Sequence, residues 1–369
     1  MSRHPFAGAS PRASRLRLPL AAAFVAIALL GAAAAQAQPF DAWLRFTGDP
    51  TNGWVRVPDS SSLDISGNFT FEAWVSISNS VTGEDCRSIA GKNYLETWWI
   101  GQCNVAGQPT LRSYLKGAGS LRQGGTIPRN VLTHIAVVFN GVQRLHYING
   151  ELAASFAESG PLPTNGTELR LGSDVSWNHT PAGLIDEVRL WNVARSTDQI
   201  RANLNKRIVA QPGLVAYWTL DGNYQDVVST HDGTGQGAGL GFFTWAAGPH
   251  CTGSTALSLC LQDRFVLTGK WRTNPAPGSP TDGNASVAIA GDNSGLFWFF
   301  SSDNWEVMLK ALNGCGLNNR YWIFSAATTN VYYRIEVFDT VGLEQKIYFN
   351  YPGPPAPAVT DTNAFATCP

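Results

Sequence analysis

Hydrophobic and polar positions alternate along many short segments of the chain, for example at Phe69, Phe71, Ala73 and Val75 within 69–75. Such segments are bounded by Gly, Pro and Asn, a pattern typical of β-strands that end in turns. The runs 134–139 and 145–148 flank Asn140-Gly141 and predict a hairpin, because both turn residues tolerate positive φ. The pattern predicts an all-β chain.

One short helix is predicted in this part of the chain. Ser196 and Gln199 have the spacing of a capping box, and Ile200 and Leu204 follow on one helical face. In the adjacent pair Trp98-Trp99, neighbouring strand residues point to opposite faces, so we expect one of the two to lie in the core.

A second group of strands follows a change in composition. Residues 238–262 are rich in Gly, Ser, Thr and Ala, which predicts a linker with a small disulfide loop. Beyond it, 263–369 predicts a smaller β-sandwich, and prolines in 351–357 predict an extended tail held by Cys368. Its seven expected strands are 264–271, 286–289, 295–300, 306–310, 321–324, 332–337 and 346–349.

The N-terminus has the features of a secretory signal peptide. A segment with four arginines is followed by an apolar run, and then by the small-x-small site Ala35-Gln36-Ala37. We expect residues 1–37 to be removed and the first domain to span 38–237. No later stretch is long and apolar enough to cross a membrane. The protein is therefore expected to be secreted: extracellular, on the cell surface or periplasmic.

Charge excludes two classes of partner. Only 14% of the residues are charged and the formal net charge is -1, which becomes more negative once the arginine-rich segment is removed. Such a chain has no electrostatic footprint for nucleic acid or anionic lipid.

All six cysteines lie in the exported part, and an even number there predicts disulfides. Fifteen pairings are possible. Proximity favours three pairs, and the absence of two-residue spacing disfavours a zinc site. The favoured pairs are Cys86 with Cys103, Cys251 with Cys260, and Cys315 with Cys368.

Two segments contain candidate functional residues. In the half-buried strand 183–192, Asp186 and Glu187 need a metal, an arginine or several N–H groups as partners, since unpaired buried charge is costly. The loop 172–180 offers an aromatic ring, a carboxylate, an amide and an imidazole on an inter-strand connection, a set suited to sugars. Its candidate ligand-binding residues are Asp174, Trp177, Asn178 and His179. Alternatively, this is ordinary loop chemistry with Trp177 against the sheet edge.

The order of motifs resembles the laminin G-like, pentraxin-like branch of the concanavalin A-like jelly rolls. The resemblance rests on 44–48, 69–75, 133–137, 147–151, the Asp186 strand and 216–218, and covers about 200 residues. It implies a two-sheet sandwich, commonly calcium-assisted, that binds sugars or protein surfaces. Asp186 and Asp49 are the candidate calcium ligands, although the family usually has Asp where this chain has Thr47. Arginine pairing is the alternative for Asp186.

Three functions are compatible with these features. The first is non-catalytic recognition of an extracellular glycan or protein, and the second is an adhesive spacer at the cell surface. The third is a glycoside hydrolase on the same scaffold. It is the least favoured, because adjacent carboxylates such as Asp186-Glu187 point to opposite faces of a regular strand, whereas a retaining glycosidase needs two on one face. We therefore expect no enzymatic activity.

Overall fold

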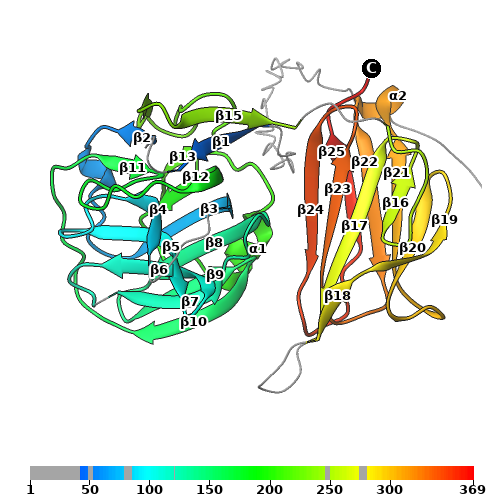
Figure 1. Ribbon diagram of the computed structural model, residues 1–369, viewed down its shortest axis with the longest axis horizontal. Coiled ribbons are helices and arrows are strands. Elements are labelled where there is room, and N and C mark those ends of the chain that lie inside the picture. Colours follow the sequence, from blue (N-terminus) through cyan, green and yellow to red (C-terminus); the bar gives the residue numbers. More distant parts are fainter. Residues whose placement is uncertain (1–41, 49–52, 79–84, 120, 246–249, 274–280) are drawn as a thin grey trace, which may run out of the picture. The chain divides into compact units, whose positions relative to one another are not determined.

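The structure is a computed structural model that describes residues 42–369 except 49–52, 79–84, 120, 246–249 and 274–280. Its strands form four antiparallel sheets (Figure 1), which confirms the predicted all-β class. Residues 42–244 supply two of the sheets, here called the first sandwich, and residues 258–365 supply the other two, here called the second sandwich. The predicted signal peptide lies outside the described residues.

The first sandwich consists of an eight-stranded and a seven-stranded sheet. The eight-stranded sheet has the order β10 (Glu151–Ala157), β9 (Gln143–Ile148), β8 (Thr133–Phe139), β3 (Phe69–Ile77), β12 (Ala182–Trp191), β1 (Ala42–Thr47) and β15 (Leu240–Thr244), with β13 (Leu214–Trp218) paired to β12. The seven-stranded sheet has the order β14 (Thr234–Gln236), β2 (Trp54–Val57), β11 (Leu169–Leu171), β4 (Cys86–Gly91), β5 (Trp98–Val105), β6 (Gln108–Leu115) and β7 (Arg122–Thr126).

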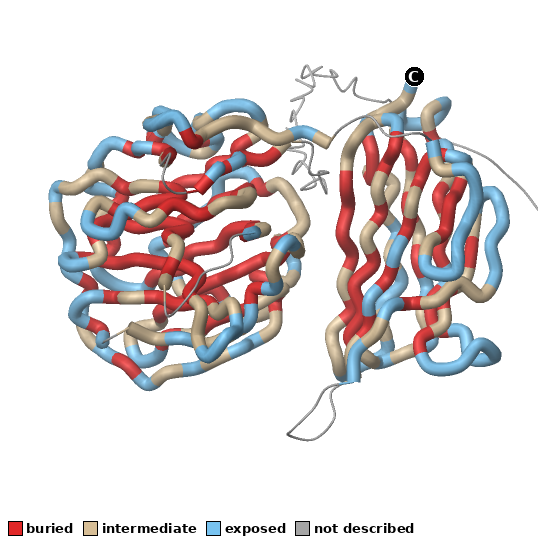
Figure 2. Tube along the Cα trace, in the orientation of Figure 1, coloured by how far each residue is buried: buried red, intermediate tan, exposed pale blue. Residues whose placement is uncertain are grey.

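These two sheets bury a shared apolar core, visible as buried strand segments in Figure 2. Trp98 on β5 lies against the rings of Phe69 and Phe71 on β3, with centroid distances of 5.3 and 6.0 Å. Trp99 belongs to a separate cluster on the other face of the same sheet. The prediction that one tryptophan of this pair is a core residue is therefore confirmed.

α1 (Thr197–Asn203) and the residues around it cover the outer face of the eight-stranded sheet at β8 and β9. The predicted capping box is present: the Ser196 hydroxyl accepts from Gln199 N, and the Gln199 side chain accepts from Ser196 N. Ile200 is fully buried against a cluster from β8 and β9. Trp74 Nε1 donates to the Leu204 carbonyl at 2.6 Å, which fixes the end of the helix on the sheet.

The second sandwich contains the seven predicted strands and three more. One sheet has the order β16 (Ser258–Leu261), β17 (Phe265–Arg272), β23 (Tyr332–Asp339) and β24 (Glu344–Asn350), with β18 (Asp282–Asn284) paired to β17. The other has the order β19 (Ser286–Ala290), β20 (Ser294–Ser301), β21 (Asn304–Asn313), β22 (Tyr321–Ala327) and β25 (Val359–Phe365). The proline-rich segment 351–357 contains no strand, and the residues after it, 359–365, form an edge strand beside β22 that the sequence did not predict.

The segment predicted as a linker also contains strands. β15 pairs with β1, because Leu240 and Phe242 pack against the core of the first sandwich, and β16 pairs with β17. The first sandwich therefore extends to Thr244 instead of ending at residue 237.

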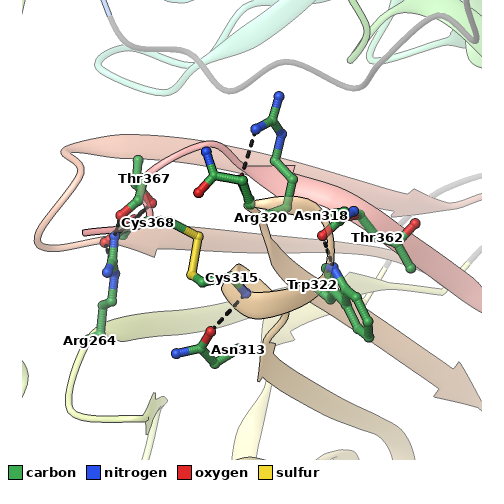
Figure 3. The surroundings of a disulfide bond; sticks show 11 residues. Arg264, Asn313, Cys315, Asn318, Arg320, Trp322, Thr362, Thr367 and Cys368 are labelled. Carbon is green, nitrogen blue, oxygen red and sulfur yellow. Dashed lines mark hydrogen bonds and ion pairs between the residues drawn. A yellow bond between two sulfur atoms is a disulfide. The ribbon is translucent and has the colours of Figure 1, made fainter.

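The three predicted disulfides are confirmed, and no described cysteine is free. Cys86 and Cys103 lie directly opposite each other on β4 and β5. Cys315 opens the short helix α2 (Cys315–Asn318) and is bonded to Cys368 (Figure 3), which ties down the C-terminus.

Candidate ligand-binding site

Aromatic side chains gather on the face of the seven-stranded sheet that points away from the core. Trp99 on β5 lies opposite Tyr114 on β6, and Tyr94, from the turn before β5, contacts both rings. A cavity of about 140 Å³, here called the aromatic pocket, opens among these strands and the 172–180 loop. Its lining residues are Cys86, Tyr94, Trp99, Arg112, Leu121 and Trp177.

Trp99 can lie flat across the sheet because its neighbour has no side chain. A Cβ at Gly101 would lie 2.2 Å from the Trp99 ring. Trp99 Nε1 donates to Ser88 Oγ at 2.8 Å, and Ser88 Oγ in turn donates to the Trp177 carbonyl at 3.0 Å. Trp99, Ser88 and the Trp177 loop are therefore joined by consecutive hydrogen bonds.

Asp174 holds the two loops of the pocket together. Its carboxylate accepts from the backbone N–H groups of Asn93, Tyr94 and Ser176 at 2.8–3.0 Å. Asp174 is fully buried, and its close approach needs Gly91, where a Cβ would lie 2.3 Å from Asp174 Oδ2. Burial raises the pKa of Asp174, while these N–H donors oppose the rise. The prediction of direct ligand contact is thereby corrected: Asp174 positions the loops.

The other predicted loop residues lie nearer the surface. Trp177 is 37% exposed and lines the pocket, with its ring 6.1 Å from Tyr94 and 5.0 Å from His179. Asn178 is exposed, and its Oδ1 accepts from Ser173 Oγ at 2.6 Å. Contact of Trp177, Asn178 and His179 with a ligand stays a prediction; the structure places Trp177 in the pocket lining and the His179 ring beside it.

Sequence reasoning missed Tyr94, Tyr114 and Arg112. Arg112 is buried, and its Nε donates to Gln123 Oε1 at 2.8 Å. In β6, Arg112 and Tyr114 alternate with the core residues Leu111 and Leu115, which is the one local signal that they share the outer face. Their meeting with Trp177 depends on strand order, which local pattern does not reveal.

Asp186 lies in the middle of β12 (Ala182–Trp191), close to Glu187, Arg207 and Asp221. It is buried, and its pKa is raised well above the usual value by burial, by Glu187 and by Asp221. A bulge places Glu187 at φ 52, between the core residues Ile185 and Val188. Asp186 and Glu187 therefore both lie on the outer side, which corrects the expectation that adjacent carboxylates point to opposite faces.

Arginine pairing was the alternative to calcium for Asp186. In the structure, the adjacent residue Glu187 forms the ion pair with an arginine. Glu187 Oε2 accepts from Arg189 Nη2 at 2.8 Å and from the Tyr217 hydroxyl. Arg207 contacts Glu187 and Asp221, so guanidinium groups already lie among these carboxylates. Among the described residues, no group of three or more His, Cys, Asp or Glu side chains is arranged to hold a metal ion. The set around Asp186 thus does not fit calcium, which needs six or more oxygen ligands.

Chelation tests the calcium prediction, whose second candidate ligand, Asp49, lies outside the described residues. We expect EDTA to leave the melting temperature of the first sandwich unchanged, because guanidinium groups already neutralise the carboxylates near Asp186. Thermal unfolding with EDTA, and again after adding calcium or magnesium, measures this. A fall with EDTA that calcium alone reverses would show a calcium site, since an ion held only by the folded state stabilises it.

Comparison with known proteins finds a family match for the first sandwich. Residues 49–201 match the family model Laminin_G_3, described as the concanavalin A-like lectin/glucanases superfamily. A search of curated proteins finds no match. Within the described ranges, no helix has the length and apolar character needed to cross a membrane.

Three solved structures illustrate the similarity. A candidate carbohydrate-binding protein of Bacteroides ovatus is 20% identical, with a TM-score of 0.47; the match covers 56% of this chain and 60% of that one. Domain 4 of a Geobacillus stearothermophilus arabinanase, in complex with arabinotriose, is 25% identical (TM-score 0.32; 40% and 70% covered). Domains LG4-5 of the mouse laminin α1 chain are 11% identical (TM-score 0.34; 86% and 84% covered). Residues 49–201 are therefore similar to the laminin G-like domains of the concanavalin A-like lectin/glucanases superfamily, and the two-sheet architecture of the first sandwich agrees with this match.

Proposed function

We propose that the first sandwich binds a carbohydrate at the aromatic pocket without cleaving it. The observation that carries this proposal is the partly exposed Trp177 side chain, which lines a cavity together with Tyr94 and Trp99. The apolar face of a sugar ring stacks on such aromatic surfaces, while hydroxyl groups bind to polar side chains. Arg112 is a polar residue of the pocket lining, and the His179 ring lies beside Trp177; Asn178 is exposed on the same loop.

The pocket is preformed, which favours binding. Asp174 fixes the backbone of Tyr94, and Ser88 fixes that of Trp177, so little side-chain and loop entropy is lost when a ligand binds. The Cys86–Cys103 disulfide crosslinks the two strands beneath it. Three disulfides are typical of chains that fold in an oxidising compartment, which supports an extracellular ligand.

The lining of the pocket supports recognition over hydrolysis. A retaining glycosidase uses two carboxylates on either side of the scissile bond. No described lining residue is Asp or Glu, and the nearby carboxylate of Asp174 is occupied by backbone donors. If the protein binds no sugar, a protein ligand becomes the favoured alternative.

A glycan array with the exported chain from Gln38 tests the proposal, with neutral and acidic sugars read in calcium and in EDTA. We expect Trp177→Ala to lower affinity for the bound sugar at least about tenfold, because an exposed aromatic anchor is lost. The melting temperature should stay unchanged. Isothermal titration with the sugar found on the array measures the affinity.

Trp305→Ala is the matched control, because Trp305 is an exposed tryptophan of the second sandwich and is 47% exposed. It should bind like the unmodified chain. A blank array would contradict sugar recognition, and equal affinity of the Trp177→Ala variant would exclude the aromatic pocket as the binding site.

A further inference from the structure

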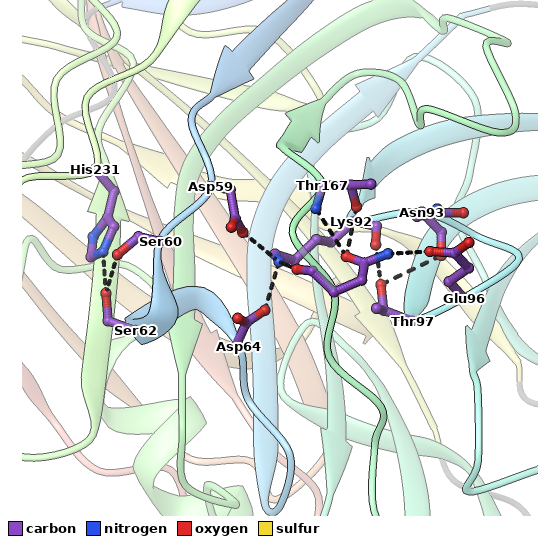
Figure 4. Close-up of polar contacts among 11 residues, drawn as sticks. Asp59, Ser60, Ser62, Asp64, Lys92, Asn93, Glu96, Thr97, Thr167 and His231 are labelled. Carbon is purple, nitrogen blue, oxygen red and sulfur yellow. Dashed lines mark hydrogen bonds and ion pairs between the residues drawn. The ribbon is translucent and has the colours of Figure 1, made fainter.

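A hydroxyl, an imidazole and a carboxylate are hydrogen-bonded in series at another place in the first sandwich. Ser62 Oγ lies 2.6 Å from His231 Nε2, and His231 Nδ1 lies 2.9 Å from Asp226 Oδ2. Figure 4 shows the Ser62 hydroxyl joined to both the His231 ring and the Ser60 hydroxyl. Ser62 and His231 are 169 positions apart in the sequence, so the fold creates this contact.

The chemistry of the three groups sets the direction of these hydrogen bonds. An ionised Asp226 can only accept, so neutral His231 carries its proton on Nδ1 and presents a lone pair on Nε2. Ser62 must then donate to Nε2, and the Ser60 hydroxyl, 2.9 Å from Ser62 Oγ, becomes a donor to Ser62. This is the proton arrangement of a serine nucleophile beside its general base.

The histidine and the aspartate are held rigidly. Asp226 Oδ1 accepts from the backbone N–H groups of Tyr217 and Val228 at 3.0 and 3.1 Å. Trp218 Nε1 donates to the His231 carbonyl at 2.8 Å. His231 and Asp226 are each only 6% exposed, so the imidazole is fixed in orientation by its surroundings.

The serine is exposed and its segment is anchored. Ser62 belongs to a single turn of 3-10 helix, η1 (Ser61–Leu63), between Asp59 and Asp64. Both carboxylates accept from the buried Lys92 Nζ, at 2.8 and 2.7 Å (Figure 4). This ammonium clamps the two ends of the segment and leaves the Ser62 hydroxyl at the surface.

A cavity of about 510 Å³ gives a substrate access to the pair. Ser62 and His231 both line it, together with the amide-bearing Asn68 and Asn192. Four serines, two asparagines and one aspartate line this cavity, against three aliphatic residues. Such a lining favours a polar alcohol over a lipid chain. It shares no lining residue with the aromatic pocket.

We propose that Ser62, His231 and Asp226 form a site that hydrolyses esters of short carboxylic acids on polar alcohols, acylated sugars among them. Ser62 Oγ would form a bond to the ester carbonyl carbon and pass its proton to His231 Nε2. The carbon–oxygen bond to the alcohol then breaks, and the alcohol leaves with that proton. Water, deprotonated by His231, attacks the acyl-serine, releases the carboxylic acid and restores Ser62. This activity is independent of sugar binding at the aromatic pocket.

Covalent labelling and turnover test the site in the exported chain from Gln38. A fluorophosphonate probe should modify Ser62, identified by peptide mass spectrometry, and p-nitrophenyl acetate should be hydrolysed. Ser62→Ala should remove the label and lower turnover at least about 100-fold, as loss of a serine nucleophile does. Ser302→Ala is the matched control, because Ser302 is an exposed serine of the second sandwich whose hydroxyl donates to Asp303 and which lines neither cavity.

Labelling of the unmodified chain does not depend on whether a variant folds, and circular dichroism checks the folding of the variants. No adduct at Ser62 on the unmodified chain would overturn the proposal. Turnover that is equal in the Ser62→Ala variant and the unmodified chain would also overturn it, leaving the Ser62–His231 hydrogen bond as a structural contact. Sugar binding on the glycan array is a separate readout, so the two proposals fail or succeed independently.

Discussion

Replacing Arg264 by alanine should lower the unfolding free energy of the second sandwich by about 3–5 kcal/mol, because it leaves a buried carboxylate without its cation. Arg264 Nε and Nη2 each donate to Asp339 at 2.7 Å, in a two-point contact, and Asp339 is fully buried. Nη2 also donates to the carbonyl and hydroxyl of Thr367 beside Cys368 (Figure 3). The change therefore loosens both β17 and the C-terminus.

Calorimetric and denaturant unfolding of the full chain measure this loss. The ion pair holds the pKa of Asp339 below its usual value, despite the opposing effect of burial. A carboxyl group with a lowered folded-state pKa contributes stability above its unfolded pKa, and this stability is lost as pH falls through the folded value. The difference in unfolding free energy between the unmodified chain and the Arg264→Ala variant should therefore become smaller as the pH is lowered.

Arg320→Ala is the control, because Arg320 donates to the carbonyl of its neighbour Asn319 at the surface. A change of less than about 0.5 kcal/mol is expected for it. If Arg264→Ala were equally mild, the two-point contact with Asp339 would contribute nothing measurable to stability.

Asp174→Ala should both destabilise the first sandwich and remove ligand binding. Three backbone N–H groups, those of Asn93, Tyr94 and Ser176, would lose their acceptor, and each unsatisfied buried donor costs about 1–3 kcal/mol. We expect a net loss of about 3 kcal/mol, since water can enter the space left by the carboxylate. Affinity should fall at least about 100-fold, because Tyr94 and Trp177 lose their positions together; this corresponds to about 2.8 kcal/mol of binding free energy.

Thermal unfolding and titration with the bound sugar separate these effects. Asp174→Asn is the matched variant, because its amide keeps one oxygen acceptor and nearly the same volume, so both losses should be smaller. Trp177→Ala should lose affinity at unchanged stability. Normal binding by a folded Asp174→Ala variant would contradict the positioning role of this carboxylate.

Local sequence patterns were sufficient to predict the fold because they record the burial of alternate strand residues. The strand predicted at 69–75, the Asn140-Gly141 turn and the capping box at Ser196 each match the structure. Both faces of β3 are buried, so its alternation separates the residues of the shared core from buried residues on the outer face. β15 and β25 were not predicted as strands. They are edge strands, and their pairing with β1 and β22 depends on contacts with distant segments.

The binding site was predicted only in part. The mixed chemistry of the 172–180 loop indicates a binding segment, and Trp177 does line a pocket. The role of Asp174 was not apparent, because its acceptance of N–H groups 80 and 81 positions away depends on the packing of two loops. For the same reason, sequence spacing gives no indication that Ser62 meets His231.

The cover over the outer face of the eight-stranded sheet has a consequence for how such a domain can diversify. Because α1 and Leu204 pack on β8, β9 and Trp74, substitutions in this covered part mainly affect folding, whereas substitutions in the loops over the seven-stranded sheet change the exposed surface. The 172–180 loop is attached through the Ser88 side chain and backbone and through Asp174. A transplanted loop that keeps these attachments would carry a different specificity on an unchanged frame.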